Sequence, residues 1–221
     1  MITFKKEYNR QFLRYLRKSI EEYNMISPGD KVAVGLSGGK DSIFLLFALK
    51  LIQLTSIKDF ELVGINIDLG FELNISPLVN FCNNNNIPII VEKTNIAEVV
   101  FEDRKEKKPC SLCSKLRKGA LIRVARANNI NKIALGHNSD DVIETLFMNV
   151  LKVGKLGTFH PNIHFDDKDI SIIRPLIYLR EDLIEKLTEK YELPVIKSPC
   201  PMDKKTTRED MKNLLISLEK I

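Results

Sequence analysis

The 221-residue sequence contains no apolar run long enough to cross a membrane. Its longest uninterrupted apolar stretch, residues 43–49, is far shorter than the ~20 residues that a membrane-spanning helix needs. Charged residues interrupt the N-terminal segment MITFKKEYNRQFLRYLRK, so it lacks the apolar centre of a secretory signal. We therefore expect a cytoplasmic protein with no membrane partner.

Cysteine is also scarce, and the four that occur are Cys82, Cys110, Cys113 and Cys200. Disulfides do not persist in a reducing cytosol. The C-x-x-C spacing of Cys110 and Cys113 therefore indicates metal, cluster or redox chemistry instead of a structural bridge. Cys82 lies in an apolar helical stretch, VNFCNN, and is expected to be a core residue.

Two common phosphate-binding motifs are missing from the stretch VGLSGGKDS, residues 34–42. It is not a Walker A loop, because Lys40 is followed by Asp41, and it is not a G-x-G-x-x-G fingerprint. It nevertheless joins a predicted strand to a predicted helix, where backbone N–H groups bind anions. An aspartate there would repel a bare phosphate unless a divalent cation bridges the two. This predicts a loop that holds the pyrophosphate of ATP together with Mg²⁺.

The net charge is only +5, but the basic residues are clustered. Residues 1–23 carry six Lys or Arg against three acidic residues, and residues 102–118 carry seven against three. Such clusters are compatible with an RNA partner. A solvated helix face explains them equally well, so charge alone does not decide between the two.

Predicted strands alternate with predicted helices along the chain. The strands are expected at 31–36, 60–68, 87–94, 132–136 and 170–176, and the helices at 7–23, 41–54, 77–83, 110–128, 139–151, 180–191 and 206–219. The alternation predicts a doubly wound α/β fold with a mostly parallel five-stranded sheet and helices on both faces. Residues 152–169 are expected to form a loop.

Three parts of the chain are expected to differ in role. Residues 1–28 form a basic helical segment, residues 29–178 the nucleotide-binding domain, and residues 179–221 a helical tail that carries Cys200. The N-terminal helix is amphipathic, and an exposed apolar face on it would suit a homodimer contact. At the end of the second predicted strand, Asn66 and Asp68 are positioned to meet adenine or ribose.

Four segments carry a resemblance to a known family. SGGKDS (37–42) resembles the loop of the ATP-pyrophosphatase, or PP-loop, superfamily, whose members adenylate a substrate and release pyrophosphate. The blocks CSLCSKLRKG (110–119), GHNSDDVIETLFMN (136–149) and IIRPLIYLRE (172–181) together resemble the tRNA 2-thiocytidine synthetase family. The order and spacing of the blocks also fit, and the resemblance covers residues 1 to about 200.

The resemblance implies an ATP site at the first loop and at the 136–149 block. Its expected residues are Gly35, Leu36, Ser37, Gly38, Gly39, Lys40, Asp41, Ser42, Asn66, Asp68, Gly136, Asp140 and Asp141. Gly136 would allow close approach to adenosine, and Asp141 (or Asp140) would bind Mg²⁺ or orient the reacting groups. Paired aspartates at a helix start more often serve as caps. Lys40, Asp141 and Arg117 are expected to be catalytic, although a solvent-facing phosphate contact suits Arg117 equally well.

The cysteines fit the same family. Cys110 and Cys113 open a helix, whose dipole and basic neighbours Lys115, Arg117 and Lys118 are expected to lower the thiol pKa values. In the thiolases of this group three cysteines hold a 4Fe-4S cluster, and Cys110, Cys113 and Cys200 occupy the matching places. One iron then stays open for a sulfur. Zinc completed by Cys82, His137, His160 or His164, and a redox dithiol, are the alternatives.

The implied reaction is an ATP-dependent sulfur transfer. ATP would adenylate a pyrimidine C2 carbonyl in tRNA, with an anticodon-loop cytidine favoured, and sulfur would replace the oxygen. The sulfur donor would be a cysteine desulfurase or free sulfide. The tail SPCPMDKKTTREDMKNLL departs from the family, which typically shows a second cysteine and a Gly-Ser-Gln stretch there. Another RNA base or a small molecule as acceptor, a cluster-free PP-loop ligase or amidotransferase, and a zinc-stabilised regulatory module therefore remain alternatives.

Overall fold

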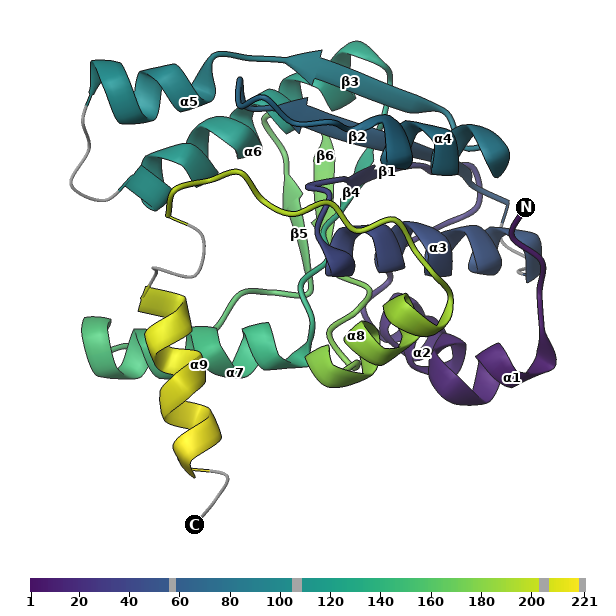
Figure 1. Ribbon diagram of the computed structural model, residues 1–221. Coiled ribbons are helices and arrows are strands. Elements are labelled where there is room, and N and C mark those ends of the chain that lie inside the picture. Colours follow the sequence, from purple (N-terminus) through teal and green to yellow (C-terminus); the bar gives the residue numbers. More distant parts are fainter. Residues whose placement is uncertain (56–58, 105–108, 203–206, 219–221) are drawn as a thin grey trace.

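A six-stranded sheet forms the centre of the protein in the computed structural model, which describes residues 1–55, 59–104, 109–202 and 207–218 (Figure 1). The strand order is β3-β2-β1-β4-β6-β5. The strands are β1 (Lys31–Gly35), β2 (Glu61–Asp68), β3 (Ile89–Lys93), β4 (Lys132–Ala134), β5 (Asn162–Phe165) and β6 (Ile170–Ile173). All pairs are parallel except β5–β6. The predicted fold class is confirmed, but the predicted number of five strands was wrong.

The additional strand is β5, which lies inside the stretch expected to be a loop. It pairs antiparallel with β6, with Asn162 opposite Ile173 and Phe165 opposite Ile170. The sequence NIHF is too short to show a strand pattern by itself. It becomes a strand because fully buried β6 offers an unpaired edge, and an antiparallel neighbour needs only a tight connection.

Helices cover both faces of the sheet, as expected. They are α1 (Lys6–Tyr8), α2 (Arg14–Glu22), α3 (Lys40–Thr55), α4 (Ser76–Asn84), α5 (Ile96–Glu98), α6 (Pro109–Ala127), α7 (Ser139–Met148), α8 (Glu181–Lys190) and α9 (Thr207–Leu218). Short π-helical segments extend α1, α5 and α7, at Asn9–Leu13, Val99–Asp103 and Asn149–Val153. The helical stretch from Ile96 to Asp103 was not predicted.

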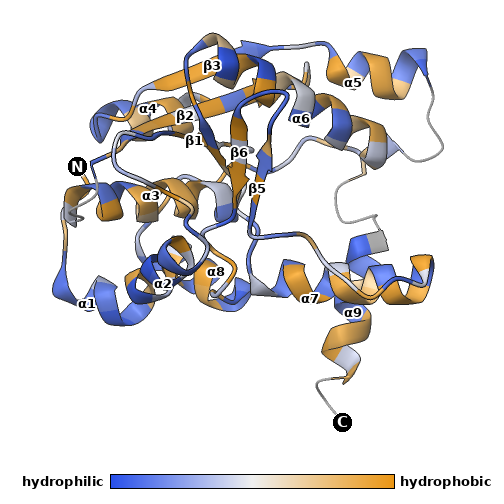
Figure 2. Ribbon diagram, turned by 180° about the vertical axis from the view of Figure 1, so that it is seen from behind, coloured by the Kyte–Doolittle hydropathy of each residue, from blue (hydrophilic) through white to orange (hydrophobic). Residues whose placement is uncertain are grey.

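The side chains of β1 alternate between two hydrophobic cores. Val32 and Val34 join the core formed with α2, α3, α4 and α8, whereas Ala33 joins the core formed with α6. Figure 2 shows hydrophobic residues concentrated in α3 and in the central strands. Helix α3 is apolar nearly all round, and this suits its place between the sheet and helices α2 and α8.

The N-terminal helical segment belongs to this core, so the expectation of an exposed apolar face was wrong. Phe12, Leu13 and Leu16 are fully buried. The ring of Phe12 lies 5.2 Å from that of Phe44 on α3, centroid to centroid. The face that was expected to support a homodimer is therefore covered by the chain itself.

Some predicted features lie outside the described residues. These are Lys105, Lys107 and Lys108 of the second basic cluster and the expected ends of the last helix, Thr206 and Glu219. Within the described ranges, no helix combines the length and the apolarity that crossing a bilayer requires.

Candidate functional site

The loop between β1 and α3 has the form of an anion cradle. Gly38 adopts φ +86°, a left-handed conformation that favours glycine. The Ser42 hydroxyl donates to the Gly39 carbonyl at 2.9 Å and accepts from the Ser37 amide at 3.2 Å, which holds the turn closed. Since α3 begins at Lys40, the free N–H groups of its first turn face the end of the sheet.

A cleft of about 800 Å³ opens beside this loop, at the carboxyl ends of the parallel strands. That is the edge at which open α/β sheets bind ligands, and the volume suits a nucleotide. The predicted site residues that line the cleft are Gly35, Leu36, Ser37, Asp41, Ser42, Cys110, Cys113, Arg117, Gly136 and Cys200. The structure thus brings the loop and the three cysteines to one cavity.

The three cysteines come from two separate parts of the chain. Cys110 and Cys113 lie in the first turns of α6, as predicted, and Cys200 lies in the segment between α8 and α9. All three are free thiols, and Cys113 interacts electrostatically with the other two. Within the described residues, no three Cys, His, Asp or Glu side chains are already arranged to hold a metal ion. Cys82, by contrast, lies on α4 and is buried in the hydrophobic core, as predicted.

The expectation of a lowered thiol pKa was wrong for Cys113. Burial raises the pKa of this thiol above its ordinary value, and the nearby Arg117 guanidinium lowers it by less. The helix start and its basic neighbours therefore do not outweigh the loss of water around this sulfur.

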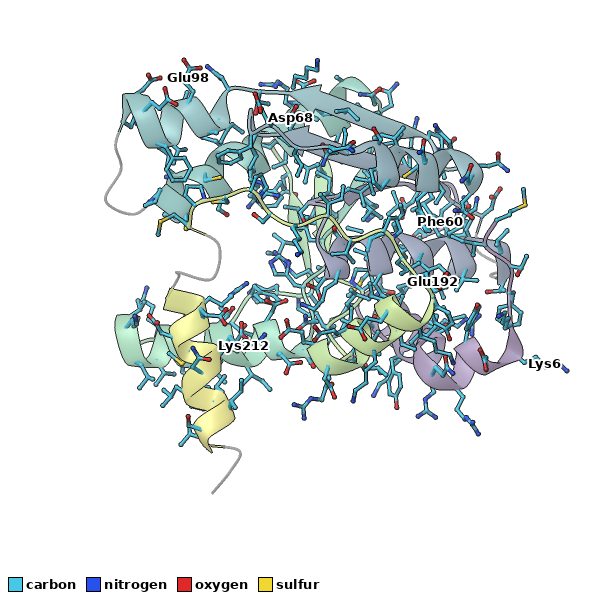
Figure 3. The ribbon with its side chains drawn as sticks, in the orientation of Figure 1. Lys6, Phe60, Asp68, Glu98, Glu192 and Lys212 are labelled. Atoms are coloured by element: carbon cyan, nitrogen blue, oxygen red, sulfur yellow. The ribbon has the colours of Figure 1, made fainter. Side chains whose placement is uncertain are left out.

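Lys40 is held by carboxylates from two elements. Its ammonium lies 2.6 Å from Glu181 Oε1 on α8 and 3.5 Å from Asp41 Oδ2. Burial alone would lower the pKa of Lys40, but these carboxylates outweigh it and raise the pKa. The second oxygen of Glu181 pairs with Lys212 of α9 at 2.6 Å, and Figure 3 labels this lysine. Lys40 is therefore charged, and α9 is tied to the base of the loop.

Asp141 combines the capping role with an ion pair. Asn138 is the N-cap of α7: its side chain accepts from the Asp141 amide, and Asp141 Oδ2 accepts from the Asn138 amide at 2.9 Å. The other carboxylate oxygen lies 2.9 Å from the Arg208 guanidinium of α9. Asp140 instead accepts from the Glu181 amide at 2.8 Å. Asp141 thus contacts Arg208, a residue that lines the cleft.

The remaining predicted residues have structural partners. The side-chain Nδ2 of Asn66 donates to the Leu36 carbonyl at 2.8 Å and so braces the start of the loop. Asp68 accepts from the Gly70 amide at 3.0 Å and lies away from α9 (Figure 3). Neither side chain lines the cleft. At Gly136, an added Cβ would lie 2.9 Å from the carbonyl carbon of Asp41, so a glycine is needed there to let α3 approach.

Sequence reasoning missed the cations and the carboxylate that reach this site from distant segments. Arg208 and Lys212 come from α9, Glu181 from α8, and Arg174 from the end of β6. Glu181, Arg208 and Lys212 occupy charged helix positions, which is the ordinary pattern of a solvated face. Arg174 and Glu181 belong to the IIRPLIYLRE block (172–181), and its resemblance to the family was a signal that could have found them. The local sequence of α9 does not indicate that Arg208 meets Asp141.

His137 follows β4 by three residues, is half-buried and lines the cleft. Burial, followed by the charges of Arg174 and Arg208, lowers its pKa from 6.5 to about 4. On acidification, the unfolded chain therefore takes up a proton before the folded chain does. We expect the free energy of unfolding to fall by about 3 kcal/mol as the pH drops from 6.5 towards 4. Urea unfolding at a series of pH values should show this loss in the wild type and not in His137→Gln.

Glu144 must be separated from this effect, because it acts in the opposite direction. Burial and, to a smaller extent, the charge of Asp141 raise the pKa of Glu144 from 4.5 to about 7. The contribution of Glu144 to the free energy of unfolding therefore falls as the pH rises from 4.5 to about 7. The comparison is therefore made between the wild type and His137→Gln at each pH. Equal acid sensitivity in both proteins would contradict the assignment to His137.

Known proteins are similar to this chain in sequence and in fold. A family model described as a PP-loop domain matches residues 5–219. A tRNA-cytidine(32) 2-sulfurtransferase of Pelobacter propionicus is 37% identical over 214 residues, which cover 95% of this chain and 80% of that protein. The protein of the same name from Burkholderia cenocepacia is 38% identical over 222 residues, covering 97% and 66%.

Among solved structures, the U34-tRNA thiolase NcsA from Methanococcus maripaludis, determined with its 4Fe-4S cluster, superposes with a TM-score of 0.78. It is 28% identical, and the match covers 96% of this chain and 73% of that chain. The predicted resemblance is confirmed by sequence and by structure. This chain belongs to the PP-loop family, within the group that contains the tRNA-cytidine(32) 2-sulfurtransferases.

Proposed function

We propose that this protein is an ATP-dependent tRNA sulfurtransferase that replaces the C2 oxygen of a cytidine with sulfur. The observation that carries the proposal is the shared cleft, in which a pyrophosphate loop and three free cysteines line one cavity. Relatives named tRNA-cytidine(32) 2-sulfurtransferase support a tRNA cytidine as the substrate. The overall reaction consumes ATP and sulfide and yields AMP and pyrophosphate.

The loop residues are assigned to the adenylation step. The C2 carbonyl oxygen attacks the α-phosphate of ATP, and pyrophosphate leaves. Backbone amides of Ser37–Ser42 and the first turn of α3 bind the departing pyrophosphate, and the Lys40 ammonium neutralises its charge. For this, Lys40 must turn from Glu181, 2.6 Å away, to the phosphates. Asp41 and Asp141, which both accept hydrogen bonds from Asn138, are the carboxylates assigned to Mg²⁺.

The cysteines are assigned to a 4Fe-4S cluster. The donor set fits in number and type: three free thiols line the cleft, two on α6 and one on a segment without regular structure. When bound by three cysteines, such a cluster leaves one iron without a protein ligand, where a sulfur can be carried. The raised pKa of Cys113 means that cluster assembly must release a proton from this thiol.

Arg117 is assigned to contact the target nucleobase during the reaction. It follows Cys113 by one helical turn, lines the cleft and is half-buried. A guanidinium at this place can stabilise the negative charge on the adenylated oxygen as sulfur attacks C2 and AMP leaves. The target base must leave its stack to enter the cleft, a requirement that suits a base in an RNA loop.

The proposal is tested by incubating the anaerobically reconstituted protein with tRNA, ATP, Mg²⁺ and sulfide. We expect ATP-dependent formation of 2-thiocytidine, detected by mass spectrometry of digested tRNA, with AMP and pyrophosphate released in equal amounts. A protein that cleaves ATP to AMP without binding iron or thiolating tRNA would instead be a cluster-free PP-loop ligase. Thiolation of a uridine would overturn the assignment of the base.

A further inference from the structure

Arg174 is a buried cation that pairs with no acidic side chain among the described residues. It follows β6 directly, within the IIRPLIYLRE block, and its side chain lines the cleft. The residue is only 8% exposed, and its Nε has no hydrogen-bond partner. Across the part of the chain that the structure describes, no carboxylate pairs with it, whereas Lys40, Arg208 and Lys212 all have one. A buried guanidinium is costly unless an anion compensates it.

The guanidinium is held rigidly in place. Its Nη1 donates to the His160 carbonyl at 2.6 Å, and its central carbon lies 4.8 Å from the centre of the Phe159 ring. The Phe159 ring also contacts His137, which is neutral near pH 7. Neutral groups, the His160 carbonyl and the Phe159 ring, therefore fix the Arg174 guanidinium. Its Nε has no hydrogen-bond partner among the described residues.

A second cation stands beside it. Lys118 of α6 lines the same cleft, and its ammonium lies 4.5 Å from the centre of the Phe165 ring on β5. Burial, the charge of Arg174 and the charge of Lys168 lower the pKa of Lys118, in that order. Like charges repel, and an aromatic ring on or just before β5 contacts each of the two cations. An anion between them would relieve both the repulsion and the desolvation.

The position of this pair separates it from the pyrophosphate loop. Arg174 follows β6 and the loop follows β1, with β4 between them, so the two are about two strand spacings, or ~10 Å, apart. The residues assigned to ATP come from the loop after β1 and from the start of α7, which follows β4. The part of the cleft at β6, next to α6 and its cysteines, is left for the second substrate.

We propose that Arg174 and Lys118 form a phosphate-binding subsite for the acceptor RNA, and that this subsite seats the target nucleotide through one of its backbone phosphates. The proposal rests on the proposed function for the identity of the acceptor. The phosphate contact would set the distance between the C2 carbonyl and the pyrophosphate loop. It positions the nucleotide without reading its base.

The test measures RNA binding without ATP or sulfide, so it does not depend on thiolation. The probe is a cytidine-containing RNA hairpin, together with a set of hairpins in which each loop phosphate in turn is a neutral methylphosphonate. In the wild type, we expect one neutral linkage to weaken binding roughly ten- to hundredfold, the effect of a lost charge-assisted hydrogen bond. Arg174→Gln should bind the unmodified hairpin correspondingly weakly and should no longer respond to that linkage.

Two further variants make the result decisive. Lys118→Gln changes an exposed residue and should reproduce part of the effect without a risk to folding. Arg123→Gln is the matched control, because Arg123 lies on the same helix, is exposed and is paired with Glu92 at 2.7 Å; it should bind like the wild type. The thermal unfolding of Arg174→Gln checks that it is folded.

The outcomes distinguish this subsite from the proposed function. If the wild type thiolates tRNA but tolerates a neutral linkage at every loop position, the subsite is wrong and the proposed function stands. If Arg174→Gln binds the hairpin normally but loses affinity for a non-hydrolysable ATP analogue, the cations bind ATP and the acceptor subsite is overturned. A wild type that binds no hairpin also overturns it. If the wild type loses affinity for one neutral-linkage hairpin, Arg174→Gln does not, and no tRNA is thiolated, the subsite stands and the proposed reaction is contradicted.

Discussion

Replacing Cys200 with alanine is expected to abolish 2-thiocytidine formation and to remove the bound iron, while ATP binding is retained. Cys200 is the one cleft-lining thiol that α6 does not supply, so two ligands would remain for the cluster. Loss of residues that merely support metal ligands costs 10- to 100-fold, so loss of a ligand should cost roughly a hundredfold or more. Iron, acid-labile sulfide and the thiolation rate are measured on anaerobically purified protein.

Cys82→Ala is the matched control for this variant. Cys82 is fully buried in the core formed with α4 and is remote from the cleft, and burial raises its pKa to about 11. The Cys82 variant should lose some stability and keep its iron and its thiolation activity. Retention of a full iron content in Cys200→Ala would mean that the third ligand has been assigned wrongly.

Replacing Gly136 with alanine is expected to disrupt the ATP site without changing any charged group. The added Cβ would lie 2.9 Å from the Asp41 carbonyl carbon and 3.1 Å from the Ser42 amide nitrogen. Both atoms are backbone in the first turn of α3, so they cannot rotate aside as a side chain would. Overpacking of this kind costs about 1–3 kcal/mol, and it would shift the pyrophosphate loop relative to β4. We expect a lower melting temperature, by about 3–10 °C, together with weaker ATP binding measured by calorimetry.

Gly119→Ala provides the same chemical change at a site with open space. Gly119 lies in α6, close in sequence to the cysteines, and a Cβ there would meet nothing within 4 Å. Alanine favours a helix over glycine by up to about 1 kcal/mol, so this variant should be as stable as the wild type or more stable. Normal ATP affinity in Gly136→Ala would show that the close approach of β4 and α3 is not needed for the loop.

Much of the nucleotide half could be predicted because its residues are neighbours in sequence. The loop 37–42 lies between a buried strand and a helix, and this local arrangement already determines an anion site. The pair Cys110 and Cys113 is similarly local, since three residues along a helix start place both thiols on one side. Alternation of strands and helices was sufficient for the fold class.

The other half of the cleft could not be predicted in this way. β5 is a strand only because β6 offers it an edge, and Phe159 and Phe165 hold Arg174 and Lys118 only after that hairpin has formed. The expected drop in the pKa of Cys113 failed for a related reason. Its basic neighbours are visible in the sequence, but the burial that outweighs them is a property of the packed cleft.

By itself, the sequence determined the sheet-and-helix order, the pyrophosphate loop and the family of this protein, because each depends on residues that lie close together along the chain. The tertiary structure alone decided which distant charges meet. It brought Glu181, Arg208 and Lys212 to Lys40 and Asp141, and it buried Arg174 away from every carboxylate that the structure describes as paired. The physical reason is that burial and long-range charge pairing arise from packing between elements far apart in sequence, and no local pattern records that packing.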